Sequence, residues 1–192
     1  EAKDEPAIAR EWLQADEPAV AGAAGLLSRP GVFAWDRVDA GSALLVEHLP
    51  SDLAGHGADL GSGHGYLSTQ VLARNPGVRA LDLYEADARA LALARDNLSA
   101  HEGIDCQFHW HDVTRGLPRG DYDFIVSNPP FHEGRAEQPE IGRAFIAAAG
   151  AALRPGGRLL LVANRQLPYE SALAQGFAST RTLAEREGYK AI

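Results

Sequence analysis

Residues 58–65 read Ala-Asp-Leu-Gly-Ser-Gly-His-Gly, a short strand pattern that runs into three alternating glycines. A helical pattern over residues 66–74 follows at once. Glycine tolerates positive φ and lets a backbone approach a ligand closely, and the N-terminus of a helix offers free N–H groups. This strand-turn-helix unit predicts an open parallel sheet whose ligand crevice lies at the carboxyl ends of the strands.

Strand and helix patterns alternate outward from this turn. Strands are expected over 58–60, 78–84, 104–110, 122–127 and 158–163, and helices over 66–74, 87–100 and 141–153. Such alternation is typical of parallel strands joined by crossover helices. Two further strand patterns, at 178–184 and 189–192, are too close for a crossover, so they must form a hairpin. The expected fold class is α/β: a Rossmann-like, doubly wound, mostly parallel sheet of seven strands with a C-terminal antiparallel hairpin strand.

The chain of 192 residues fits one such domain. We expect residues 1–28 to form an N-terminal helical extension or linker, with helices over 6–15 and 18–27, and residues 29–192 to form the domain. A further helix is expected over 38–49, before Pro50. Because residue 1 is Glu and the chain has no Met, we expect it to be part of a longer chain.

The charge distribution bears on possible partners. The formal charge is -8, which argues against non-specific nucleic-acid binding by the whole chain. Four basic and ten acidic residues give residues 1–57 a net of -6, leaving -2 for residues 58–192. Seven arginines between Arg115 and Arg165 could contact phosphates, although compositional bias explains them equally well. No apolar run could span a membrane, and the single cysteine, Cys106, favours a cytoplasmic location.

Acidic residues at strand ends are the first candidate ligands. The spacing G-x-G-x-G differs from that of dinucleotide binders, and Asp59 before it suits a cationic group such as the amino acid end of S-adenosylmethionine. Glu85, 24 residues beyond Gly61, is the expected anchor of both ribose hydroxyls. Asp82 is expected instead to be a mid-strand side chain with a local partner. Asp112, after the third strand, could accept a hydrogen bond from the exocyclic amine of adenine. His109 and His111 share a strand face without a third ligand, so we expect no metal.

The segment Asn128-Pro129-Pro130-Phe131-His132 follows the fourth strand. Two prolines make it rigid and leave the carbonyl of Pro129 free to accept hydrogen bonds. An amide side chain, a fixed carbonyl and an aromatic ring can together hold a planar group that bears an amine. The alternative is a proline strand terminator followed by a core phenylalanine.

The glycine turn and Asn128 to Phe131 together resemble class I S-adenosylmethionine-dependent N-methyltransferases. The longer string from Asn128 to Gly134 is similar to that of bacterial ribosomal RNA guanine-N2 methyltransferases, in their catalytic C-terminal domain. Further resemblances to this family lie at residues 31–33, 39–42, 153–157, 162–164 and 167–169. The versions at 41–42, 132–134 and 167–169 favour the small-subunit (16S) branch.

The resemblance implies methyl transfer to the N2 amine of a guanine in ribosomal RNA, within an assembled or partly assembled small subunit, by a monomer that uses S-adenosylmethionine. It implies that Asn128 and Pro129 grip the amine and that Phe131 stacks on the base. Pro130 and His132 are expected beside the substrate. The expected cofactor ligands are Asp59, Gly61, Gly63, Glu85, Asp112 and Asn128.

Other functions remain open at this stage. A large-subunit RNA methyltransferase would carry a similar pattern. A methyltransferase for protein glutamine or DNA adenine would also be similar, but usually with tyrosine where Phe131 stands. A nicotinamide dehydrogenase would need the G-x-G-x-x-G spacing that this turn lacks. A catalytically silent RNA-binding module would have no need of Glu85, Asp112 and Asn128.

Overall fold

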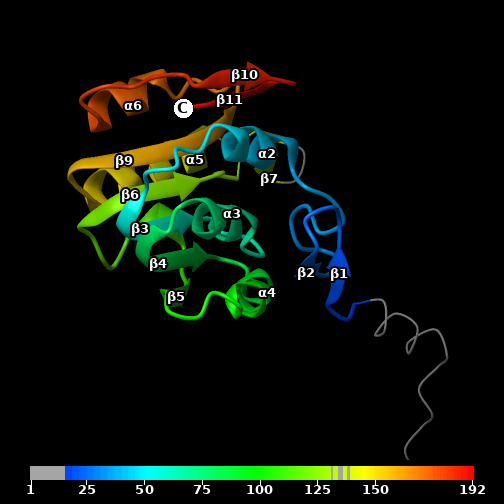
Figure 1. The fold of residues 1–192 in the computed structure, drawn as a ribbon. Helices are drawn as coiled ribbons and strands as arrows, with labels where there is room; N and C mark the ends of the chain where they lie inside the picture. Colours follow the sequence, from blue (N-terminus) through cyan, green and yellow to red (C-terminus); the bar gives the residue numbers. More distant parts are fainter. Residues whose placement is uncertain (1–15, 131, 134–135, 138) are drawn as a thin grey trace, which may run out of the picture.

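The computed structural model describes residues 16–130, 132–133, 136–137 and 139–192 (Figure 1). Its main sheet has seven strands in the order β10-β11-β9-β6-β3-β4-β5. Their bounds are β3 Ala54–Leu60, β4 Gly77–Glu85, β5 Asp105–Trp110, β6 Tyr122–Ser127, β9 Leu153–Asn164, β10 Ala184–Arg186 and β11 Tyr189–Ala191. The strands β3, β4, β5, β6 and β9 pair in parallel, whereas β11 pairs antiparallel with both β9 and β10. The α/β fold expected from the sequence is confirmed.

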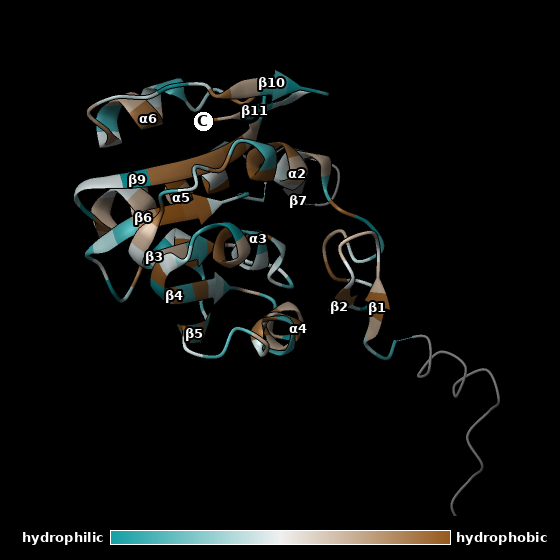
Figure 2. Ribbon diagram, in the orientation of Figure 1, coloured by the Kyte–Doolittle hydropathy of each residue, from teal (hydrophilic) through white to brown (hydrophobic). Residues whose placement is uncertain are grey.

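Helices cover both faces of this sheet (Figure 1). They are α2 Ala40–Glu47, α3 Tyr66–Arg74, α4 Ala88–Leu98, α5 Pro139–Ala152 and α6 Glu170–Gly176, with a 3-10 turn at Val113–Arg115. Leucines of α2, α3 and α4 pack on one face, and α5 packs on the other. Apolar residues line the central strands between these two layers (Figure 2). None of the helices described is long and apolar enough to cross a membrane.

The strand order reverses between β3 and β6. From β3 the chain moves outward to β4 and β5, then returns to place β6 on the other side of β3. In open α/β sheets, ligands bind at such a switch point, outside the carboxyl ends of the strands. Leu60 is the register partner of Ser127, and the Ser127 hydroxyl donates to the Leu60 carbonyl at 2.7 Å. The residues after Leu60 and after Ser127 therefore start from adjacent points.

The helix expected over 18–27 is wrong. The strands β1 Ala19–Ala21 and β2 Leu26–Ser28 form a hairpin there, and Gly22 and Gly25 both have φ of +65°. Two residues in the left-handed backbone conformation interrupt a helix, so the apolar residues of this segment form two short strands instead. The helix expected over 6–15 lies outside the described residues.

The C-terminal hairpin is confirmed, but its first strand is shorter than expected. Residues 178–183 belong to no strand, and β10 begins at Ala184. Glu187 and Gly188, both with positive φ, form the two-residue turn between β10 and β11. The helix α6, which the sequence patterns did not indicate, buries Leu173 against β9. Beyond the Asn-Pro-Pro segment, β7 His132–Glu133 pairs antiparallel with β8 Ala136–Glu137.

Candidate active site

The glycine turn connects β3 to α3. Gly61, Gly63 and Gly65 all have positive φ, at 71°, 55° and 91°. The N–H groups of Gly61 and Ser62 donate to the Tyr84 carbonyl at 2.8 and 3.2 Å, which ties the turn to β4. A Cβ atom on Gly63 would meet no atom within 4 Å, whereas one on Gly65 would lie 2.8 Å from Leu98 Cδ1. Gly63 thus borders open space for a ligand, and Gly65 serves the packing of the turn on α4.

Asp59 lies beneath this turn and is completely buried. Its Oδ2 accepts a hydrogen bond from the Ser68 hydroxyl at 2.7 Å. Within the described part of the chain, Asp59 Oδ1 and Ser62 Oγ are buried without a hydrogen-bond partner. The pKa of Asp59 is raised to about 7, mainly because the carboxyl group is buried; the Ser68 hydrogen bond opposes this shift and the charge of nearby Glu85 adds to it. A cationic ligand above the turn would stabilise the ionised form of this carboxyl group.

Glu85 ends β4 beside the turn. Its Oε2 accepts from Gly63 N and its Oε1 from Asp87 N, both at 2.8 Å. The carboxylate therefore holds the turn on one side and the start of α4 on the other. Each of its oxygens has a further lone pair with which to accept a ligand hydroxyl.

Asp82 is turned away from this edge, as the sequence indicated. It is fully buried, accepts from the Tyr122 hydroxyl at 2.6 Å, and lies 3.3 Å from His56 Nε2 and 3.5 Å from Arg119 Nη1. His109 Nε2 lies 3.7 Å away. The prediction that Asp82 has local partners is confirmed, and these partners keep it from the crevice.

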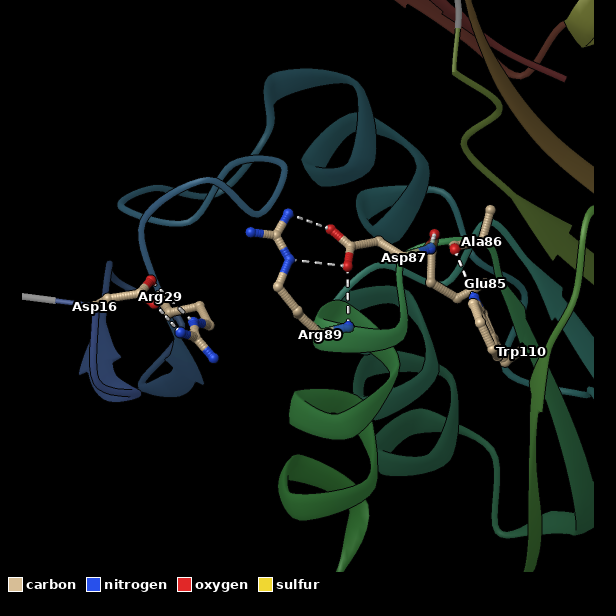
Figure 3. Close-up of polar contacts among 7 residues, drawn as sticks. All are labelled: Asp16, Arg29, Glu85, Ala86, Asp87, Arg89 and Trp110. Carbon is tan, nitrogen blue, oxygen red and sulfur yellow. Dashed lines mark hydrogen bonds and ion pairs between the residues drawn. The ribbon is translucent and has the colours of Figure 1, made fainter. Parts of the chain in front are cut away.

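Asp112 follows β5, with its side chain exposed. Its Oδ1 accepts from the backbone N–H and the hydroxyl of Thr114, at 3.0 and 2.6 Å, and these hydrogen bonds lower the pKa of Asp112. Trp110, the register partner of Glu85, is 73% exposed, and its indole N–H donates to the Ala86 carbonyl at 2.8 Å. Figure 3 shows the indole beside the backbone of Glu85 and Ala86. The crevice thus has an exposed aromatic ring that sequence reasoning had not selected.

Asn128 follows β6 and is held by residues that precede the sheet. Its Nδ2 donates to Asp39 Oδ2 and to Ser42 Oγ, both at 2.9 Å. Asp39 also caps α2, because the same oxygen accepts from Ser42 N at 2.7 Å. The backbone carbonyl oxygen of Asn128 lies 3.9 Å from where a Cβ atom on Gly61 would stand. Asn128 and the glycine turn therefore lie next to each other, as expected for adjacent strand ends.

A pocket lies between the glycine turn, Asn128 and the segment before α2. It is lined by Phe33, Ala34, Arg37, Val38, Asp39, Ser42, Gly61, Ser62, Gly63, His64, Tyr66, Leu67 and Asn128. The residues from 33 to 42 were not selected individually from the sequence, although resemblance had marked parts of this stretch. The cap pattern of Asp39 before an apolar helix predicts a helix start, but not a contact with Asn128.

Phe131 lies outside the described residues, and for His132 only the backbone of β7 is described. The arginines expected to contact phosphates are mostly ion-paired. Five of the six that are described between residues 115 and 165 have an acidic partner within 4 Å: Arg119, Arg143, Arg154, Arg158 and Arg165. Their charge is thus largely neutralised within the chain.

The site can be compared with known proteins. The family model described as the methyltransferase small domain matches residues 23–192. A ribosomal RNA small subunit methyltransferase C of Pseudomonas paraeruginosa is 40% identical over 173 residues, which cover 90% of this chain and 51% of the relative. A ribosomal RNA large subunit methyltransferase G of Alcanivorax borkumensis is 38% identical over 157 residues, 80% of this chain and 40% of the relative.

A solved structure gives the same picture. The 16S rRNA N2 G1207 methyltransferase of T. thermophilus, in complex with AdoMet and guanosine, is 30% identical with a TM-score of 0.74, covering 91% of this chain and 49% of that one. The chain thus spans about half the length of the relatives it matches.

Proposed function

Because the chain belongs to the methyltransferase small domain family, we propose that it transfers a methyl group from S-adenosylmethionine to the exocyclic N2 of a guanine in 16S ribosomal RNA. The observation that carries this proposal is the position of Asn128, held at the switch point of the sheet beside an open glycine turn. The names of the 40% identical relative and of the solved structure with guanosine support the substrate.

The described residues fit the cofactor. Gly63 borders open space, and two buried polar atoms beneath the turn, Asp59 Oδ1 and Ser62 Oγ, have no partner in the described chain. Glu85 would accept both ribose hydroxyls, and Asp112 would accept from the adenine amine. Asp59 would act on the ammonium group through its charge, since its carboxyl group is buried. When bound, S-adenosylmethionine supplies an electrophilic methyl group on a sulfonium sulfur.

The chain's contribution to the chemistry is orientation. Asn128 Oδ1 and the Pro129 carbonyl accept from the two N–H bonds of the amine, and so direct its lone pair toward the methyl group. These residues would hold the amine in line with the methyl group that the bound cofactor would supply, and water would accept the proton that the amine loses. Positioning of this kind can lower a barrier by up to roughly 7 to 11 kcal/mol. Phe131 would stack on the base, with Pro130 and His132 beside it.

The natural substrate is proposed to be the assembled or partly assembled small subunit, acted on by a monomer in the cytoplasm. The chain carries a formal charge of -8, and its described arginines are largely paired, so naked RNA should bind weakly. Ribosomal protein and RNA together would supply contacts that this chain lacks.

The test is methyl transfer to small subunits from cells that lack this protein, followed by mass spectrometry of the nucleosides. N2-methylguanosine in 16S RNA is the expected product, and Asn128→Ala is the matched inactive control. Methylated adenine or methylated ribosomal protein in its place would refute the proposal.

A second candidate is the large subunit, which the 38% identical relative from Alcanivorax borkumensis favours. The same assay with large subunits separates the two. Methylation of 23S RNA alone would replace the small-subunit substrate with this one.

A further inference from the structure

The orientation of the Asn128 amide is set by Asp39. An ionised carboxylate can only accept hydrogen bonds, so the Asn128 atom that lies 2.9 Å from Asp39 Oδ2 must be the nitrogen. The second N–H of that nitrogen donates to Ser42 Oγ, also at 2.9 Å. Both amide protons are therefore used. Rotating the amide by 180° would place its oxygen against the carboxylate, which is repulsive.

This arrangement leaves one polar atom of the amide, Oδ1, for a ligand, and that atom is an acceptor. Among the residues that the structure describes, none donates a hydrogen bond to it. Asn128 lines a pocket beside the glycine turn together with Asp39 and Ser42, so Oδ1 is the amide atom that can accept from a group bound there. An acceptor in this place selects a substrate with an N–H donor and disfavours a carbonyl oxygen.

We propose that Asp39 is the positioning residue of this site, which locks the Asn128 amide with its oxygen toward the substrate amine. The effect of Asp39 on turnover rests on the proposed methyl transfer. The hydrogen bond by which Asp39 holds the Asn128 amide does not depend on that reaction. Asp39 lies 89 positions before Asn128, at the start of α2, and also caps that helix through Ser42 N. A test must therefore separate the capping role from the locking role.

Three substitutions of Asp39 achieve this separation. Serine is a good N-cap, but its hydroxyl is one atom too short to reach Asn128, so Asp39→Ser keeps the cap and breaks the lock. Asparagine also caps well and keeps an oxygen of the right reach, so Asp39→Asn preserves both. Alanine removes both. Asp87→Ser is the matched control, since Asp87 caps α4 by accepting from Arg89 N and makes no described contact with Asn128.

In Asp39→Ser we expect turnover to fall roughly 10- to 100-fold, as loss of a charge-assisted hydrogen bond implies. The KM for the cofactor should stay within about twofold and the melting temperature close to that of wild type. Asp39→Asn should restore most of the turnover, and Asp87→Ser should leave it unchanged. Wild-type turnover in Asp39→Ser, or an equal loss in Asp87→Ser, would overturn the proposal.

A measurement without substrate keeps this inference distinct from the proposed function. The side-chain NH2 resonances of Asn128 in an NMR spectrum, identified by their loss in Asn128→Asp, should be shifted and slow to exchange in wild type and in Asp39→Asn. In Asp39→Ser they should move to the positions of solvent-exposed amides. If the resonances behave so while wild type methylates no guanine, the lock stands and the proposed reaction fails. Unchanged resonances in Asp39→Ser would show that Asp39 does not hold the amide.

Discussion

Replacing Glu85 by alanine is expected to weaken the binding of S-adenosylhomocysteine about 100-fold. A hydrogen bond from a hydroxyl to a carboxylate contributes roughly 1.5 to 3 kcal/mol. Losing the hydrogen bonds of two ribose hydroxyls therefore weakens the binding free energy by about 3 to 6 kcal/mol, and the half-buried position of Glu85 favours the lower end of this range. Three kcal/mol corresponds to a factor of about 100 in the dissociation constant.

The structure adds a complication that the assay must resolve. Glu85 also accepts from the backbone N–H groups of Gly63 and Asp87, so its removal could distort the glycine turn. Calorimetry with the 2′,3′-dideoxy analogue of the same ligand separates the two effects. If Glu85 binds the hydroxyls, the analogue should bind wild type about 100-fold more weakly than the parent ligand does. In Glu85→Ala the two ligands should bind with nearly the same affinity.

Full additivity of the two changes would contradict this role of Glu85. If the dideoxy analogue loses the same factor in wild type and in Glu85→Ala, the hydroxyls bind elsewhere and Glu85 acts only on the turn. Equal binding of both ligands by wild type would remove the ribose anchor altogether.

Three further predictions follow from the geometry. Asn128→Ala should lower turnover far more than it raises KM, and calorimetry should show nearly unchanged affinity for the cofactor. If this variant keeps wild-type turnover, the Asn-Pro-Pro segment serves only to end the strand. Because the pKa of Asp59 is raised from 3.8 to about 7, the folded chain keeps a proton that the unfolded chain releases above pH 4, so the free energy of unfolding should fall by about 3 kcal/mol between pH 4 and 7. Urea denaturation should show this fall in wild type and not in Asp59→Asn, and equal slopes would contradict the raised pKa. Asp82→Asn should destabilise the fold by about 3 kcal/mol, because the buried Asp82 contacts Tyr122 and His56, yet leave cofactor affinity unchanged; a loss of affinity like that of Glu85→Ala would make Asp82 part of the cofactor site.

Which residues lie at strand ends could be derived from the sequence. Alternating strand and helix patterns require parallel strands, and parallel strands end at one edge, so Gly61, Glu85, Asp112 and Asn128 were expected to meet there. The register places Leu60 beside both Tyr84 and Ser127, so Gly61, Glu85 and Asn128 start from adjacent points. Period-two alternation also separated Asp82 from Glu85 correctly, because it depends only on backbone geometry.

Local patterns failed where several backbone states suit the same residues. The segment over 18–27 has helical spacing, yet two glycines with positive φ make it a hairpin, which Asn97 of α4 holds through the backbone of Leu27. Such a choice depends on a partner 70 residues away. The helix α6 likewise depends on packing against β9, which no local pattern contains. The strand β10 joins the sheet through β11, which in turn pairs with β9.

The sheet, the glycine turn and the polar residues at its edge can be predicted from the sequence, because spacing and periodicity are local properties of the chain. How those residues are oriented depends on the folded structure. It buries Asp59 and so raises the pKa of its carboxyl group, and it gives Glu85 two backbone donors. It also places Asp39 against Asn128, because the start of α2 meets the residue that follows β6. Hydrogen bonds between residues 89 positions apart depend on the packed arrangement of whole elements. Within the part of the chain that the structure describes, that arrangement gives the amide oxygen of Asn128 no donor.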